Sequence, residues 1–186
     1  MEIRLTHDDV EKVLAEGSRR VMNALRGGLG AGKFFFAGDY GGLMGHAIGA
    51  AAECVSSKLT GEIWDPLARD FSTSWDVGGY EVRLTMHHHG EFRTAQDHEE
   101  TSKKYLIVGL ARRPWTFRAV GTIDGVDARA FGKLEDRMGY GFTWWVHEDK
   151  IEPISKEMAD RVREPDAVDF INRAIEDLKM RKVRET

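Results

Sequence analysis

The sequence of 186 residues, with a net charge of -4 at neutral pH, fits one domain that buries roughly two-thirds of its unfolded surface. Cys54 is the single cysteine, which excludes an internal disulfide and a zinc site of cysteine pairs, and favours a reducing compartment. The N-terminus has no apolar signal segment, and no apolar run approaches the ~20 residues of a membrane span, so we expect a cytoplasmic protein outside the membrane. The negative charge gives no general reason to expect nucleic acid as a partner.

Residues 7–26 are predicted to form one amphipathic helix. Thr6 stands in the N-cap position, and Asp9 follows three residues later in the place of the acid of a capping box. Apolar side chains then recur at helical spacing, at Val10, Val13, Leu14, Val21 and Leu25.

A glycine-rich stretch, Gly27–Lys33, ends this helix and satisfies the G-x-x-x-x-G-K part of a phosphate-binding loop. Phe34, however, stands where a Ser or Thr must ligate magnesium, and a helix rather than a strand precedes the motif. We therefore interpret the stretch as a flexible connector.

A second helix is predicted from Leu43 to Leu59, with Gly61 as its C-terminal cap. Its glycines and alanines predict close packing against a sheet or another helix. Glu53 is an acid within this run of small residues, so it could reach towards the sheet. His46 lies two helical turns before Glu53, on the same face.

Several strands are predicted after the helices. Residues 80–87 alternate between apolar and polar side chains, which indicates a strand with one buried face. Residues 105–111 form a nearly continuous apolar run, typical of a central strand. Further strands are predicted at 116–123 and 142–147, separated by a short helix-like piece at 127–134. This order indicates a mixed α/β or α+β domain.

The composition becomes charged after Pro153, so we divide the chain into a domain over residues 1–156 and a helical extension over residues 157–186. Residues 165–182 carry an apolar stripe at helical spacing. This C-terminal helix is predicted either to pack on the core or to pair with a second protomer in a homodimer.

Asp76, Glu81 and Arg83 are the candidate catalytic residues. A carboxylate on a turn and another on the adjacent strand can converge on one hard cation such as Mg²⁺ or Mn²⁺. Arg83 lies two positions beyond Glu81 on the same strand face and would place positive charge over an anion at that metal. This arrangement suits hydrolysis of a phosphodiester. The alternative is an ordinary surface strand with alternating charges.

His87 begins the run His87–His89, and it shares the strand face of Glu81. It is a candidate for a supporting catalytic role. The alternative is that the run is only a polar strand end or a hairpin tip.

These segments, in this order, resemble the PD-(D/E)xK superfamily of restriction-endonuclease-like nucleases, and more closely small phage-encoded members with a "DVG…EVR" hairpin. The resemblance covers residues 7–156. It implies a central mixed sheet flanked by helices. The segments that carry it are the helix with Glu53, Trp64–Pro66, Asp76–Arg83, Tyr105–Gly109, Phe117–Ile123 and Trp145–Pro153.

The resemblance implies that Asp76, Glu81 and Glu53 ligate the metal. Arg83 stands where the superfamily usually has lysine, and arginine is not deprotonated at working pH, so it cannot act as a general base. Three alternatives follow: a metal-bound hydroxide needs no side-chain base, His87 supplies one, or the protein is slow or inactive. Lys103 or Lys104 could supply a displaced ammonium group. Asp97 is interpreted as a turn or cap residue.

The sequence therefore predicts a metal-dependent nuclease acting on DNA rather than RNA, of phage or mobile-element origin. The main alternative is a catalytically inactive protein of the same fold that binds nucleic acid or a protein partner. A scaffold protein with Phe34–Phe36 and Trp144–Trp145 as contact surfaces is a third interpretation.

Overall fold

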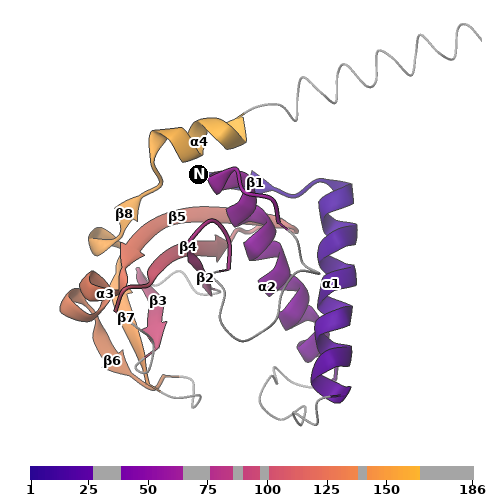
Figure 1. The fold of residues 1–186 in the computed structure, drawn as a ribbon, viewed down its shortest axis with the longest axis horizontal. Helices are drawn as coiled ribbons and strands as arrows, with labels where there is room; N and C mark the ends of the chain where they lie inside the picture. The colour runs from indigo at the N-terminus through magenta and orange to yellow at the C-terminus, as the bar shows by residue number, and fades with distance from the viewer. Residues whose placement is uncertain (27–38, 65–75, 86–89, 97–100, 138–141, 164–186) are drawn as a thin grey trace, which may run out of the picture.

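A computed structural model of the chain describes residues 1–26, 39–64, 76–85, 90–96, 101–137 and 142–163. These residues form a mixed α+β fold with four α-helices and two sheets, as predicted (Figure 1). Several predictions fall outside the described residues: those on Gly27–Lys33, Phe34–Phe36, His87–His89, Asp97 and the helix 165–182.

The elements follow one another along the chain as β1 (Glu2–Arg4), α1 (His7–Arg26), α2 (Asp39–Thr60), β2 (Glu81–Thr85), β3 (Glu91–Gln96), β4 (Lys104–Leu110), β5 (Thr116–Asp124), α3 (Gly125–Phe131), β6 (Lys133–Glu135), β7 (Thr143–His147), the 3₁₀-helix η2 (Glu148–Lys150), β8 (Glu152–Pro153) and α4 (Lys156–Arg163). Among the described strands, one sheet has the order β1-β5-β4-β2 with β8 paired to β5, and the other has the order β3-β7-β6. Strands β2 and β4 run parallel, and the other pairs are antiparallel.

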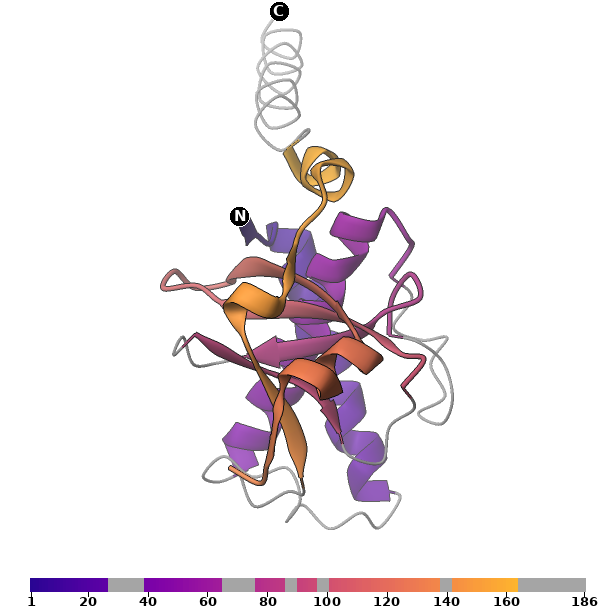
Figure 2. The same ribbon diagram turned by 90° about the vertical axis from the view of Figure 1, so that its left-hand side faces the viewer.

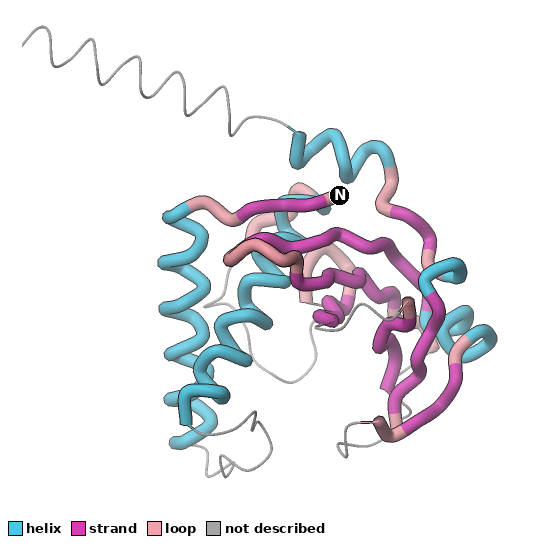
Figure 3. Tube along the Cα trace, turned by 180° about the vertical axis from the view of Figure 1, so that it is seen from behind, coloured by secondary structure: helices cyan, strands magenta, loops and turns pink. Residues whose placement is uncertain are grey.

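The molecule has three layers. Helices α1 and α2 cover one face of the five-stranded sheet, and the three-stranded sheet with α3 lies on the other side (Figures 1 and 2). The view from behind shows the same separation of the paired helices from the strands (Figure 3).

Helix α1 begins with the predicted capping box. The backbone N–H of Thr6 donates to Asp9 Oδ2 at 2.9 Å, and the backbone N–H of Asp9 donates to Thr6 Oγ1 at 3.2 Å. These two bonds satisfy donors that a helix start leaves unpaired. The predicted bounds of this helix, 7–26, are confirmed.

The small residues of α2 pack closely, as predicted. A Cβ at Gly17 of α1 would lie 2.8 Å from the backbone of Ala47, so the two helices approach at this glycine. Ala50 and Ala51 are fully buried in the same layer. Gly61 ends α2 with a φ of +77° and donates its backbone N–H to Ser57 O at 2.8 Å, which confirms the predicted cap.

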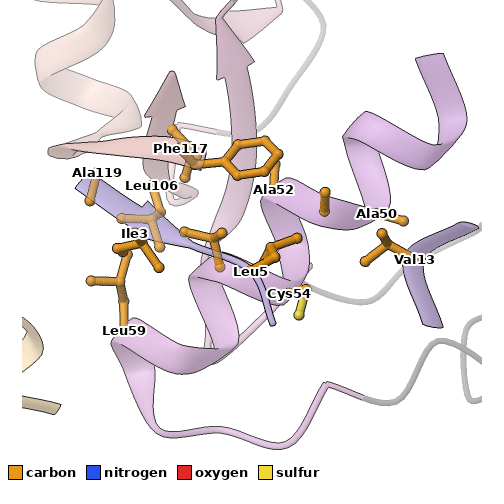
Figure 4. Packing of buried hydrophobic residues seen from close by; sticks show 13 residues of the cluster. Ile3, Leu5, Val13, Ala50, Ala52, Cys54, Leu59, Leu106, Phe117 and Ala119 are labelled. Atoms are coloured by element: carbon orange, nitrogen blue, oxygen red, sulfur yellow. The ribbon is translucent and has the colours of Figure 1, made fainter. Parts of the chain in front are cut away.

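Two apolar clusters lie on opposite faces of the five-stranded sheet. The cluster on the helix side joins Leu106 and Phe117 to α1 and α2, and Figure 4 shows Phe117 directed towards Ala52 and Val13 towards Ala50. The cluster on the other side lies between the two sheets. The predicted central strand 105–111 is confirmed as β4.

The predicted helix-like piece at 127–134 is wrong in its second half. Helix α3 ends at Phe131, and Leu134 belongs to strand β6, in register with Trp144 of β7. The reason is tertiary: Gly132 donates to Ala128 O at 3.1 Å and ends the helix, and β7 then supplies ladder partners for the next residues. Helix α4 packs Met158 and Val162 on the helix-side cluster. The division of the chain at residue 156 stays a prediction.

No helix in the described part of the chain combines the length and the apolar character needed to cross a bilayer.

Candidate functional site

The candidate site lies on β2, at the edge of the five-stranded sheet as the described strands define it. Val82 and Leu84 pack on the helix-side cluster. Glu81 and Arg83 alternate with them and are in register with Tyr105 and Ile107, which belong to the cluster on the other face. The predicted strand parity is therefore confirmed over β2, and it directs Glu81 and Arg83 away from the helices.

Among the described residues, Glu81 has two cationic partners. Lys103 Nζ donates to Glu81 Oε1 at 2.5 Å, and Arg83 Nη1 lies 3.7 Å from Glu81 Oε2. Lys103 comes one residue before β4, and the parallel register that pairs Glu81 with Tyr105 places Lys103 near the start of β2. The sequence proposed Lys103 or Lys104 as the displaced ammonium group, and in the structure it is Lys103 that reaches Glu81.

Lys104 points to a different partner. Its ammonium lies 3.8 Å from Asp124, and both side chains are more than half exposed. The two adjacent lysines therefore separate into one at the candidate site and one on the solvent surface.

Three of the contacts that Arg83 makes fix its position. Its Nε donates to the carbonyl of Thr94 on β3 at 2.8 Å, and its guanidinium lies 5.2 Å from the centre of the Tyr105 ring. The third contact is the one to Glu81. Arg83 thus links the edge of one sheet to the other sheet, and its charge is held beside Glu81.

Asp76 is positioned by a tight turn. Val77 and Tyr80 form an isolated bridge, and the two glycines between them have φ of +54° and +79°. Positive φ at both central residues is the requirement of a type I′ hairpin turn, which glycine meets without strain. The turn brings Asp76 Oδ2 to the backbone N–H of Val82 at 2.7 Å. The Asp76 carboxylate therefore lies beside the peptide bond that follows Glu81.

Glu53 has a different environment. Arg20 of α1 donates to both of its carboxylate oxygens, at 3.0 Å and 2.7 Å, and the indole N–H of Trp64 donates at 3.3 Å. Helix α2 covers the sheet face opposite to Glu81. The structure thus turns Glu53 towards Arg20, and its role as a metal ligand stays a prediction.

Arg20 is the residue that sequence reasoning missed. It also donates to Glu16 Oε1 at 2.6 Å, and Glu16 binds Arg19 as well, so one network joins the two helices. The spacing of Glu16 and Arg20, one helical turn apart, was the local signal available. Burial, together with the charge of Arg20, lowers the pKa of His46 below its ordinary value.

The described residues supply part of a ligand set for a divalent metal ion. The described ranges contain no group of three or more His, Cys, Asp and Glu side chains arranged to hold a metal. Asp76 and Glu81 are two carboxylates of the kind that Mg²⁺ and Mn²⁺ accept, and Mg²⁺ usually completes its shell with waters and substrate phosphate. These two residues could hold the ion.

Comparisons of the chain with protein-family models, curated proteins and solved structures found no match. The resemblance to the PD-(D/E)xK superfamily stays a prediction.

Proposed function

We propose that the protein is a metal-dependent nuclease of the cytoplasm that hydrolyses phosphodiester bonds, in DNA rather than RNA. The observation that supports this proposal best is the contact of Lys103 with Glu81, beside Arg83 and the Asp76 turn. Two cations and two carboxylates thus lie at one edge of the described sheet, and phosphodiester hydrolysis can use groups of both kinds, which supports the proposal.

In this proposal Asp76 and Glu81 hold the divalent cation through carboxylate oxygens. When bound, such a cation supplies an activated water and offsets the charge of the departing oxygen. Lys103, which contacts Glu81, would donate a hydrogen bond to an oxygen of the substrate phosphate. Arg83 stays protonated, so its part is to stabilise charge on the phosphate and not to accept a proton.

The position of Lys103 gives a reason why Arg83 can replace the lysine of the resembled motif. Lys103 reaches Glu81 from the neighbouring strand, so an ammonium group is present without a lysine on β2. The burial of Arg83 against Tyr105, and its bond to Thr94, give it a second part in joining the two sheets.

A catalytically inactive protein that binds nucleic acid is the second candidate. It is favoured by the cations that already surround the acids, because Glu81 contacts two cations and Glu53 is held by two nitrogens of one arginine. A protein whose carboxylates serve only as ion-pair partners would bind no metal.

Incubation of circular and linear DNA, and of RNA, with Mg²⁺ or Mn²⁺ tests the proposal. We expect cleavage by the wild type that EDTA stops, and a loss of about 10²-fold or more in Asp76→Asn, Glu81→Gln and Lys103→Met. Lys104→Met and Asp124→Asn are matched controls, since Lys104 follows Lys103 in sequence and forms an exposed pair with Asp124, and both should cleave normally.

Circular dichroism would establish that each variant is folded. A wild type that binds nucleic acid but cleaves none of it with either metal would favour the second candidate. Equal cleavage by Lys103→Met and Lys104→Met would exclude the part given to Lys103.

A further inference from the structure

The outer face of the three-stranded sheet carries a row of aromatic and basic residues. Trp145 of β7 is in register with Arg93 of β3 on one side and with Lys133 of β6 on the other. Directly opposed residues of antiparallel strands point to the same face, so these three side chains form one row. Phe92 and Val146, one position along, are buried in the cluster on the other face of this sheet.

Arg137 lies over this row. Its guanidinium is 4.6 Å from the centre of the Trp145 ring. Glu91 accepts from Arg137 Nη1 at 2.6 Å, and Glu135 accepts from Arg137 Nε, so a carboxylate from each outer strand holds the guanidinium in place. The Arg137 side chain is still 34% exposed, so solvent reaches this pair.

The ring of Trp145, rather than its N–H group, is what this face presents. The indole Nε1 is buried and has no hydrogen-bond partner among the described residues. A half-buried tryptophan with an unsatisfied donor contributes through its apolar ring and through the cation stacked on it.

Three basic residues of this face, Arg93, Lys133 and Arg137, stand beside two carboxylates, Glu91 and Glu135. Both carboxylates are engaged by Arg137, and Lys133 is exposed. The exposed Lys133 therefore offers a positive charge to an anionic ligand.

We propose that this surface, formed by Arg93, Lys133, Arg137 and Trp145 and here named the Trp145 face, binds single-stranded nucleic acid. A base would stack on the Arg137–Trp145 pair, and phosphates would contact Lys133 and Arg93. The nucleic acid must be single-stranded, because the bases of a duplex are stacked on each other and their rings cannot stack on Arg137 and Trp145. The inference rests on the proposed function and narrows its substrate.

The Trp145 face is connected to the candidate site through β3. Arg93 belongs to the face, and the next residue, Thr94, provides the carbonyl that holds Arg83.

Fluorescence anisotropy of a labelled oligodeoxythymidylate in EDTA tests the inference, with a duplex of equal length beside it. The wild type should bind the single strand more tightly than the duplex. We expect Arg137→Gln to weaken binding about tenfold, the loss that one stacked base supplies. Lys133→Gln should weaken it by a smaller factor and reduce the salt dependence. Lys104→Gln removes the same charge from an exposed lysine on β4 and should bind as the wild type does.

Arg137→Lys separates stacking from charge, because lysine keeps the charge and lacks the flat guanidinium. Binding by Arg137→Lys as tight as that of the wild type would overturn the stacking role. The inference would also be overturned if the wild type bound the duplex as tightly as the single-stranded oligonucleotide, or if it bound neither. Self-association through this face in place of nucleic-acid binding would overturn it as well.

Glu81→Gln keeps the two proposals distinguishable. It should bind the oligonucleotide normally and not cleave it. Arg137-dependent binding by a wild type that never cleaves would contradict only the nuclease proposal, and cleavage that is unaffected by Arg137→Gln would contradict only the present one.

Discussion

Two groups of acidic and basic residues in this protein use the same chemistry in different surroundings. Between α1 and α2, Arg20 binds Glu53 through two nitrogens and Glu16 through a third, and the three side chains are only 10%, 9% and 2% exposed. At the edge of β2, Glu81 receives one bond from Lys103, and these side chains are 13% and 28% exposed.

The difference indicates which group is structural and which can exchange partners. A buried carboxylate held by a forked guanidinium has its hydrogen-bonding capacity used by the protein, and breaking the pair leaves an uncompensated charge. A carboxylate that meets a flexible ammonium near solvent can share its oxygens with a cation or a substrate. The three predictions below test this distinction, beginning with the largest effect.

Arg20→Met should destabilise the fold by about 3–5 kcal/mol, because it leaves Glu53 buried without its principal cation. Urea denaturation measures the free energy of unfolding. Arg19→Met is the matched control, since Arg19 binds the same Glu16 but is 29% exposed, and its loss should cost about 1 kcal/mol. If the two variants are equally stable, the network between the helices is not what holds them together.

The acid sensitivity of stability should depend on Glu16. Burial alone raises the pKa of Glu16, but hydrogen bonds from Arg19 and Arg20 outweigh it and hold the pKa below its ordinary value of 4.5. A carboxyl with a depressed folded pKa stabilises the fold above its unfolded pKa and loses that contribution as the pH falls through the folded value.

The free energy of unfolding should therefore fall as the pH is lowered from about 5 to 3, and Glu16→Gln should flatten part of this slope. Urea denaturation at a series of pH values measures it. Glu157→Gln is the control, because Glu157 is an exposed carboxylate in a one-turn pair with Arg161. A slope that Glu16→Gln leaves unchanged would contradict the assignment.

Lys103→Met should have the smallest effect on stability, about 1 kcal/mol or less, because Arg83 still lies 3.7 Å from Glu81 and compensates its charge. The same substitution should raise the affinity for a divalent metal ion. Removing the ammonium leaves Glu81 more negative, so Mn²⁺ should bind a few-fold more tightly, as calorimetry measures, while Lys104→Met binds it as the wild type does. Weaker Mn²⁺ binding in Lys103→Met would show that Lys103 does not compete for Glu81.

Much of the candidate site could be read from the sequence. The alternation of β2 assigned Glu81 and Arg83 to one face, and Asp76 was assigned to a turn before that strand. Two lysines, Lys103 and Lys104, could also be identified at the start of β4. The sequence could not choose between them, because the choice depends on the register of the parallel strands β2 and β4, and Lys103 is 22 residues from Glu81 in sequence.

The prediction that Glu53 reaches towards the sheet shows most clearly what the sequence could not determine. An acid among small residues indicates a close neighbour, and the neighbour is there, but it is Arg20 of the other helix, 33 residues away in sequence. Periodicity gives the face of a helix and does not state which element covers that face.

The sequence by itself determined the capped first helix, the closely packed second helix, the central strand and the parity of the site residues. Each of these depends on side chains within a few positions of one another, where backbone geometry fixes the spacing. Only the tertiary structure decided that Lys103 meets Glu81, that Arg83 joins the two sheets, and that β6 follows α3. Those contacts depend on strand register and helix packing between distant segments, which local spacing does not encode.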